Sequence, residues 1–143
     1  MVQDPRTEQL GSWIVVLSND AIGRAGEYQA ASIFELHGIT TTHVDVKAVD
    51  LWVETPSGRR VTVQVKSSLG PRPLEGGRKN PRYKFHLHRQ TACAMADVFC
   101  FVALDLGCIR LCSSAELAQG NQMFHARDMN RQMMLEDIKR YLY

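Results

Sequence analysis

The feature that most constrains the fold of this chain is a pair of strand-like segments joined by a tight turn. Residues 50–54 and 59–66 alternate polar and apolar side chains and contain many β-branched residues. Between them, Thr55-Pro56-Ser57-Gly58 places proline and glycine where a tight turn favours them. The pattern predicts a β-hairpin, and its register decides which side chains share a face.

The predicted register of this hairpin brings polar side chains together. If the chain turns between Thr55 and Arg59, Asp50 lies directly opposite Gln64. Because side chains alternate across a strand, Gln64 and Lys66 point to one face and the valines around them point to the other, buried face. We therefore expect a carboxylate, an amide and an ammonium group to lie close to one another.

A helix and a further strand are expected before the hairpin. Apolar periodicity predicts the helix at about residues 21–37, with Asn19 or Asp20 as its N-cap and Gly38 at its end. The β-branched run at residues 39–44 predicts the strand.

After the hairpin, a loop rich in Gly, Pro, Arg and Lys at residues 69–82 leads into more sheet and helix. The expected elements are a short strand at 83–88, a helix at 90–97, an apolar strand covered on both faces at 98–104, a strand at 108–112, a short helix opened by a capping box at 113–116, and an amphipathic helix at about 128–142. The predicted class is α/β, with a mixed central sheet flanked by helices in one domain covering residues 1–143.

Composition limits the function classes. The chain is 45% hydrophobic and 22% charged, as in ordinary globular domains, and no stretch approaches the roughly 18 apolar residues of a membrane helix. No signal-peptide pattern is seen, so a cytoplasmic protein is expected. The four cysteines form no CxxC pair and favour buried free thiols over a zinc site.

Positive charge is concentrated in one part of the chain, although the net charge is only +2. Residues 55–90 hold nine Lys or Arg and a single acidic residue, Glu75. An ordinary solvated loop could have this composition, but the excess of cations favours contacts with nucleic acid phosphates. The candidate DNA-binding residues are Arg59, Arg60, Arg72, Arg78, Lys79, Arg82 and Lys84.

A second carboxylate lies on the apolar stripe of the first predicted helix. Glu27, Ala30, Ala31 and Phe34 share a face at helical spacing, and an unpaired carboxylate there is costly. A metal ion is one candidate partner, and Gly23 and Gly26 would let the helix approach another backbone closely.

Each of these features alone has an ordinary explanation. Asp50 and Lys66 could form a surface salt bridge, and Glu27 could simply favour the first turn of its helix. Five histidines show no helical ligand spacing and are expected to be structural, while the six methionines are expected in a core or a subunit interface. The combination, in order and on compatible faces, favours a catalytic site.

That combination resembles the PD-(D/E)XK nuclease superfamily. The resemblance rests on Glu27, Asp50 and Gln64-Val65-Lys66, and on the phrases GEYQAASIFELHGI, VTVQVKSS and ADVFCFVALD, and it covers about residues 21–112. It is similar to members in which Gln replaces the second acid, such as group I intron homing endonucleases of this fold, and Holliday-junction resolvases share the αβββαβ core. The chain departs from the motif at Val49, where the family has Pro, and at Gln64.

The resemblance implies a metal-dependent endodeoxyribonuclease that acts on duplex or branched DNA. Mg²⁺, or Mn²⁺ in its place, would be held by Asp50, the Gln64 amide oxygen and the Val65 carbonyl, with Glu27 binding through water or holding a second ion. Lys66 would position or deprotonate the attacking water and offset charge on the phosphate.

Cutting both strands with one site per chain implies a homodimer or homotetramer, for which we expect the C-terminal helix to form the interface. The alternatives are a resolvase of four-way junctions, a DNA-binding module that has lost catalysis because of Gln64, and an RNA-processing or toxin nuclease.

Overall fold

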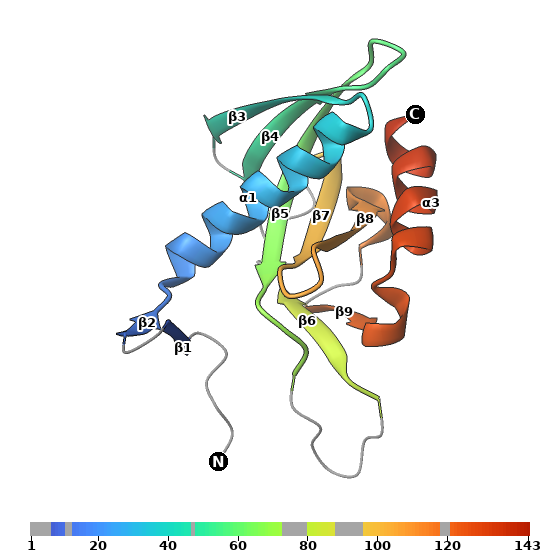
Figure 1. Ribbon diagram of the computed structural model, residues 1–143. Helices are drawn as coiled ribbons and strands as arrows, with labels where there is room; N and C mark the ends of the chain where they lie inside the picture. The colour runs from blue at the N-terminus through green and yellow to red at the C-terminus, as the bar shows by residue number, and fades with distance from the viewer. Residues whose placement is uncertain (1–6, 11–12, 47, 73–79, 88–95, 118–120) are drawn as a thin grey trace.

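The computed structural model describes residues 7–10, 13–46, 48–72, 80–87, 96–117 and 121–143 (Figure 1). Its strands are β1 (Thr7–Leu10), β2 (Trp13–Val16), β3 (Thr40–Val46), β4 (Val49–Glu54), β5 (Arg60–Ser68), β6 (Arg82–His86), β7 (Val98–Ala103), β8 (Cys108–Ser113) and β9 (Asn121–His125). Its helices are α1 (Asn19–Leu36) and α3 (Arg131–Leu142), with 3₁₀ turns at Ser114–Glu116 and Ala126–Asp128.

The central sheet has five strands in the order β3-β4-β5-β7-β8. Only β5 and β7 run parallel, and the other neighbours are antiparallel, so the sheet is mixed. Two smaller two-stranded sheets pair β1 with β2 and β6 with β9. The predicted α/β class, with a mixed sheet flanked by helices, is confirmed.

The β4–β5 hairpin has the predicted register. Leu51 pairs with Val63, and the turn closes where the Thr55 N–H donates to the Arg59 carbonyl at 2.8 Å. The Thr55 hydroxyl accepts from the Arg59 N–H at 3.0 Å, and Gly58 has a φ of 85°, which favours glycine. The turn chemistry thus fixes which residues of β4 and β5 face each other.

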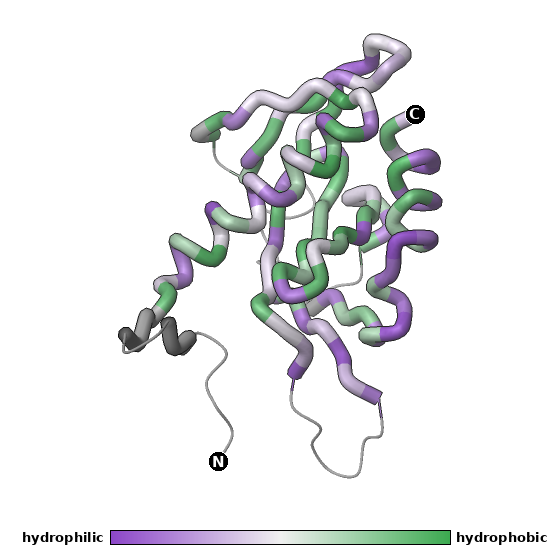
Figure 2. The backbone as a smooth tube through the Cα atoms, viewed as in Figure 1, coloured by the Kyte–Doolittle hydropathy of each residue, from purple (hydrophilic) through white to green (hydrophobic). Residues whose placement is uncertain are grey.

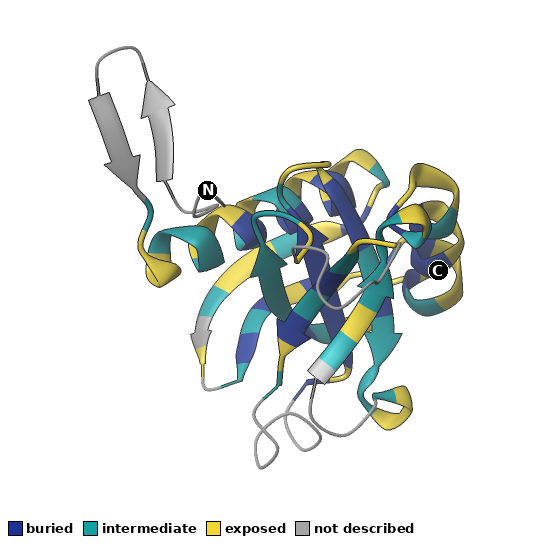
Figure 3. Cartoon of the chain, turned by 90° about the horizontal axis from the view of Figure 1, so that it is seen from below, coloured by how far each residue is buried: buried dark blue, intermediate teal, exposed yellow. Residues whose placement is uncertain are grey.

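Two apolar clusters lie on opposite faces of the sheet. The first joins α1 and α3 to one face, through residues such as Phe34, Val63 and Ile138. The second joins the other face to the β6–β9 sheet, through residues such as Phe101 and Phe85. Strand β7 contributes to both clusters; it is hydrophobic along its length (Figure 2) and every residue in it is buried (Figure 3).

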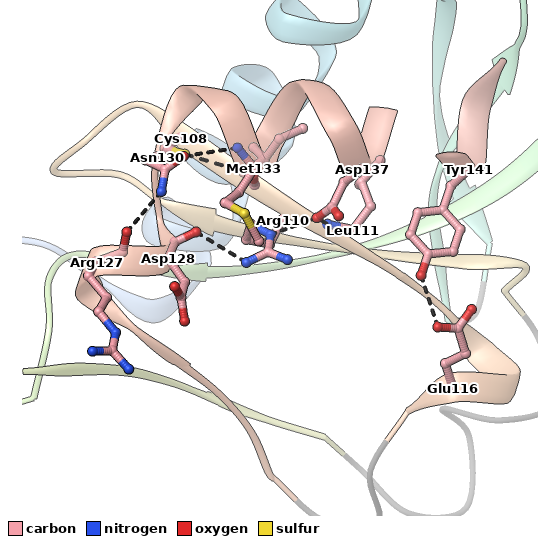
Figure 4. Close-up of polar contacts among 11 residues, drawn as sticks. Cys108, Arg110, Leu111, Glu116, Arg127, Asp128, Asn130, Met133, Asp137 and Tyr141 are labelled. Carbon is pink, nitrogen blue, oxygen red and sulfur yellow. Dashed lines mark hydrogen bonds and ion pairs between the residues drawn. The ribbon is translucent and has the colours of Figure 1, made fainter. Parts of the chain in front are cut away.

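Polar contacts fix α3 against β8 (Figure 4). Asp137, which is 8% exposed, accepts from Arg110 Nε at 2.7 Å and from the Leu111 N–H at 2.9 Å through the same oxygen. Arg110 also donates to the Asp128 carbonyl at 3.1 Å. The apolar face of α3 is therefore used inside the chain, and a subunit interface on this helix would have to use its exposed face.

Helix ends differ from the prediction in three places. The N-cap of α1 is Ser18, not Asn19 or Asp20, and its hydroxyl accepts from the Ala21 N–H at 3.1 Å. Instead of the expected helix at 113–116, the chain forms a 3₁₀ turn at Ser114–Glu116. The predicted capping box is not formed, since the Ser113 hydroxyl donates to the Glu116 carboxylate and not to the backbone. The last helix begins at Arg131, since the Asn130 side chain caps it.

Some elements were not expected. Strand β9 and the β1–β2 hairpin have no counterpart in the prediction. The predicted helix at 90–97 lies almost wholly outside the described residues.

Among the described cysteines, Cys100, Cys108 and Cys112 are free thiols, and burial raises the pKa of each. No helix in the described part of the chain is long and apolar enough to cross a membrane.

Candidate functional site

The candidate site lies where β4 separates from β5. The paired ladder ends at Leu51 and Val63, and beyond it Asp50 Oδ2 accepts a hydrogen bond from the Val65 N–H at 2.7 Å. The Asp50 side chain therefore occupies the position that the next ladder carbonyl would take. Because the N–H and C=O of one strand residue point to the same edge, the Val65 carbonyl also faces this gap.

Helix α1 reaches the same gap because it packs very close to β5. A Cβ atom on Gly26 would collide with the side chain of Ser67, and it would lie 3.6 Å from Val65 Cγ1. Only glycine allows this approach, and it places Glu27 beside the end of β4. The sequence pointed to this close contact at Gly26; Gly23, by contrast, has open space around it.

The carboxyl groups of Glu27 and Asp50 lie against each other. The pKa of Glu27 is raised to about 7 from an ordinary value of 4.5. The causes are partial burial, a hydrogen bond between the two side chains, and the negative charge of Asp50, which together outweigh the opposing charge of Arg24. Two acids held together in this way share a proton or bind a cation.

Gln64, the residue before Val65 on β5, carries an unsatisfied polar atom. Its Oε1 is buried and has no hydrogen-bond partner, as is also true of the Ser67 hydroxyl. Leaving a buried carbonyl oxygen unpaired costs about 1–3 kcal/mol, so such an atom calls for an explanation. A bound cation would satisfy such an oxygen.

The donor set fits a hard divalent cation. Glu27 and Asp50 offer carboxylate oxygens, Gln64 an amide oxygen and Val65 a backbone carbonyl, and Mg²⁺ and Ca²⁺ prefer oxygen ligands. No group of three or more His, Cys, Asp or Glu side chains suited to a metal occurs in the described ranges.

Lys66 lies two residues beyond Gln64 on β5 and shares its face. Val63 and Val65 pack on the α1 side, so Gln64 and Lys66 face the β7 side chains Phe99 and Phe101, their partners in register. Lys66 is half-buried. No ion pair joins it to Asp50, although both residues are described, so the plain salt-bridge explanation is not supported.

The predicted basic residues do not form a single patch. Arg59 and Arg60 lie at the turn end of β5, and Arg59 donates to the Tyr141 carbonyl near the end of α3 at 2.6 Å. Arg72, Arg82 and Lys84 lie beyond the other end of β5, roughly 30 Å away for nine strand residues. Arg78 and Lys79 lie outside the described residues.

The chain thus has a mixed α/β sheet in which polar residues lie where two strands diverge beside a helix. The chain resembles the solved structure of a bacterial homing endonuclease, I-Ssp6803I, with a TM-score of 0.60 and 17% sequence identity over 75% of each chain. At this identity the likeness is one of fold. No family model matches the sequence, and neither does any curated protein.

Proposed function

We propose that the protein is a metal-dependent endonuclease of the PD-(D/E)XK type that hydrolyses phosphodiester bonds in DNA. The observation that carries the proposal is the junction at Asp50, where its carboxylate meets Glu27 on one side and the Val65 N–H on the other. The residue before Val65 on β5, Gln64, carries a buried oxygen without a hydrogen-bond partner. The fold shared with a homing endonuclease supports the same reading.

Each residue has a distinct task in this proposal. Asp50, Gln64 and the Val65 carbonyl would hold Mg²⁺, and Glu27 would complete the site directly or through water. The bound ion supplies Lewis-acid activation of the phosphate and stabilises the leaving oxygen. Lys66 orients the attacking water and offsets the charge that develops on the phosphate.

Contacts of these residues support this assignment of tasks. The bond from the Val65 N–H holds Asp50 at the end of the ladder, so its carboxylate needs no further ordering to receive a ligand. The Glu27 carboxyl gives up its proton when a cation binds, since the ion stabilises both negative charges. Lys66 is held by a strand paired on β7, which is buried throughout.

The experiment is nicking of supercoiled plasmid by the purified full chain, with Mg²⁺, with Mn²⁺ and with a chelator. We expect nicked and then linear DNA with either ion and none with the chelator. Asp50→Asn serves as the inactive control, and Asp20→Asn, in the exposed first turn of α1, serves as the matched active control. Equal nicking by wild type and Asp50→Asn would rule out this site.

The replacement of an acid by Gln64 favours one other function, a DNA-binding module without catalysis. The loss of a negative ligand weakens a metal site, and a binding module would tolerate that loss. A wild-type protein that binds DNA but nicks neither plasmid nor a four-way junction with any divalent ion would establish this alternative. Faster cleavage of the junction than of a linear duplex would instead indicate a resolvase.

A further inference from the structure

We infer that the β6–β9 ribbon enters the major groove of the DNA substrate and reads its bases. This inference rests on the proposed function and names the element that gives it sequence preference. The ribbon pairs Arg82 with His125 and Lys84 with Met123, and strand β9 was not expected from the sequence. A major groove about 12 Å wide admits a two-stranded ribbon.

The inner face of the ribbon is fixed to the sheet. The Phe101 ring on β7 lies 5.1 Å from that of Phe85 and 5.3 Å from that of Phe124, between centroids. The Tyr83 hydroxyl donates to Asp105 beyond the end of β7, with its two oxygens at 2.8 and 3.0 Å. Tyr83 and Phe85 are almost fully buried, so the ribbon is a rigid platform.

The outer face of the ribbon is polar and basic. Residues that alternate with the buried ones point outward, and among those with described side chains there is no acidic residue. They are Arg82, Lys84, His86, Met123 and His125. Lysine donates to guanine O6 and N7 in the major groove, and apolar side chains contact the thymine methyl group, so this face carries the side chains that read bases.

One end of the outer face is suited to a phosphate. Arg82 and His125 are cross-strand neighbours, and both are partly exposed. Arg72 lies on the other side of Arg82, since its N–H donates to the Arg82 carbonyl at 2.7 Å. Three basic residues in a row fit the negative oxygens of a DNA backbone.

The ribbon also lies next to the proposed catalytic residues. Phe101, on which the ribbon packs, is the register partner of Lys66 on β5. Ribbon, Gln64 and Lys66 therefore share one face of the sheet, and β6 lies near the end of β5 (Figure 1). Bases read by the ribbon would flank the phosphate that is cut.

Selection from a random duplex pool tests this inference without requiring cleavage. The Lys66→Ala protein would be used to bind the pool. The bound sequences would be compared with those selected by Lys66→Ala protein that also carries Lys84→Ala or Met123→Ala. The charge-matched control is Lys139→Ala, on the exposed side of α3. Circular dichroism would check that each variant is folded.

We expect an enriched sequence that Lys139→Ala leaves unchanged. Lys84→Ala should lower the preference at one or two adjacent base pairs by roughly 5- to 100-fold. Arg82→Ala should instead weaken binding to all sequences alike, and it should lower the slope of log affinity against log salt concentration by about one. No enriched sequence, or one that survives both Lys84→Ala and Met123→Ala, overturns the inference. Plasmid nicking without an enriched sequence would contradict the inference about the ribbon and leave the proposed function standing. An enriched sequence without nicking would contradict the proposed function and support the inference about the ribbon.

Discussion

The Asp50 carboxylate accepts a hydrogen bond of 2.7 Å from the backbone N–H of Val65, at the point where the β4–β5 ladder ends. The Asp50 side chain thus accepts the bond that follows the last backbone pair of the ladder, at the point where the two strands separate. The other contact of Asp50 is with Glu27 on α1, so a single residue joins three elements of the fold. Its structural role and the chemical role proposed for it can be separated by substitution.

Asp50→Asn should separate these roles. The amide oxygen can still accept from the Val65 N–H, so the free energy of unfolding should change by less than about 1.5 kcal/mol. Binding of Mn²⁺, measured by calorimetry, should weaken by about ten-fold or more, because one ligand charge is lost. Asp20→Asn should change neither quantity. Unchanged Mn²⁺ affinity in Asp50→Asn would contradict the site.

Gln64→Glu should strengthen metal binding and lower the stability of the metal-free fold. A third carboxylate beside Glu27 and Asp50 repels them when no ion is present and attracts a cation more strongly. At about 4 Å such charges interact by roughly 1 to 4 kcal/mol, so the Mg²⁺ affinity should rise about ten-fold or more. Thermal unfolding with and without Mg²⁺ measures both effects. A lower melting temperature at every Mg²⁺ concentration would show that residue 64 is not a ligand.

The raised pKa of Glu27 gives the metal-free protein a specific pH dependence. The folded-state pKa is about 7 and the ordinary value is 4.5, so between these values the folded chain binds more protons than the unfolded one. This contribution to stability is fully present below pH 4.5 and is lost as the pH rises through 7. Urea unfolding at pH 5 and pH 8 should show a larger loss for wild type than for Glu27→Gln. Saturating Mg²⁺ should reduce the difference, because the ion replaces the proton.

Asp137→Ala should destabilise the fold more than any surface change on α3. It leaves the Arg110 guanidinium, itself mostly buried, without its carboxylate, and it removes the acceptor of the Leu111 N–H. Breaking a buried ion pair from one side costs about 3–5 kcal/mol. The exposed neighbour Glu136→Ala should change the free energy of unfolding by less than about 0.5 kcal/mol. Similar urea midpoints for the two variants would contradict the structural role of Asp137.

The parts of the fold that sequence reasoning predicted depend on local chemistry. The hairpin register follows from Thr55-Pro56-Ser57-Gly58, and β7 follows from an unbroken apolar run. The proximity of Glu27 to the hairpin was also predictable, because an acid on an apolar stripe next to a glycine indicates close packing against another element.

The parts that were missed depend on long-range pairing. Strand β9 has the sequence NQMFH, which lacks β-branched residues, and it is a strand because it pairs with β6. The division of the basic residues between the two ends of β5 was also missed, since composition does not record where a chain turns. The bond from Val65 to Asp50 depends on where the ladder stops, which no local pattern specifies.

The most direct test of the account compares cleavage and binding by Lys66→Ala. In the proposed mechanism Lys66 acts beside the reacting phosphate and binds no metal, so its loss should slow plasmid nicking by about 10²- to 10⁴-fold while DNA affinity falls only slightly. Lys139→Ala, equally a loss of one positive charge, should leave the nicking rate unchanged. A Lys66→Ala protein that nicks plasmid at the wild-type rate would contradict the central claim that this face of β5 carries the active site.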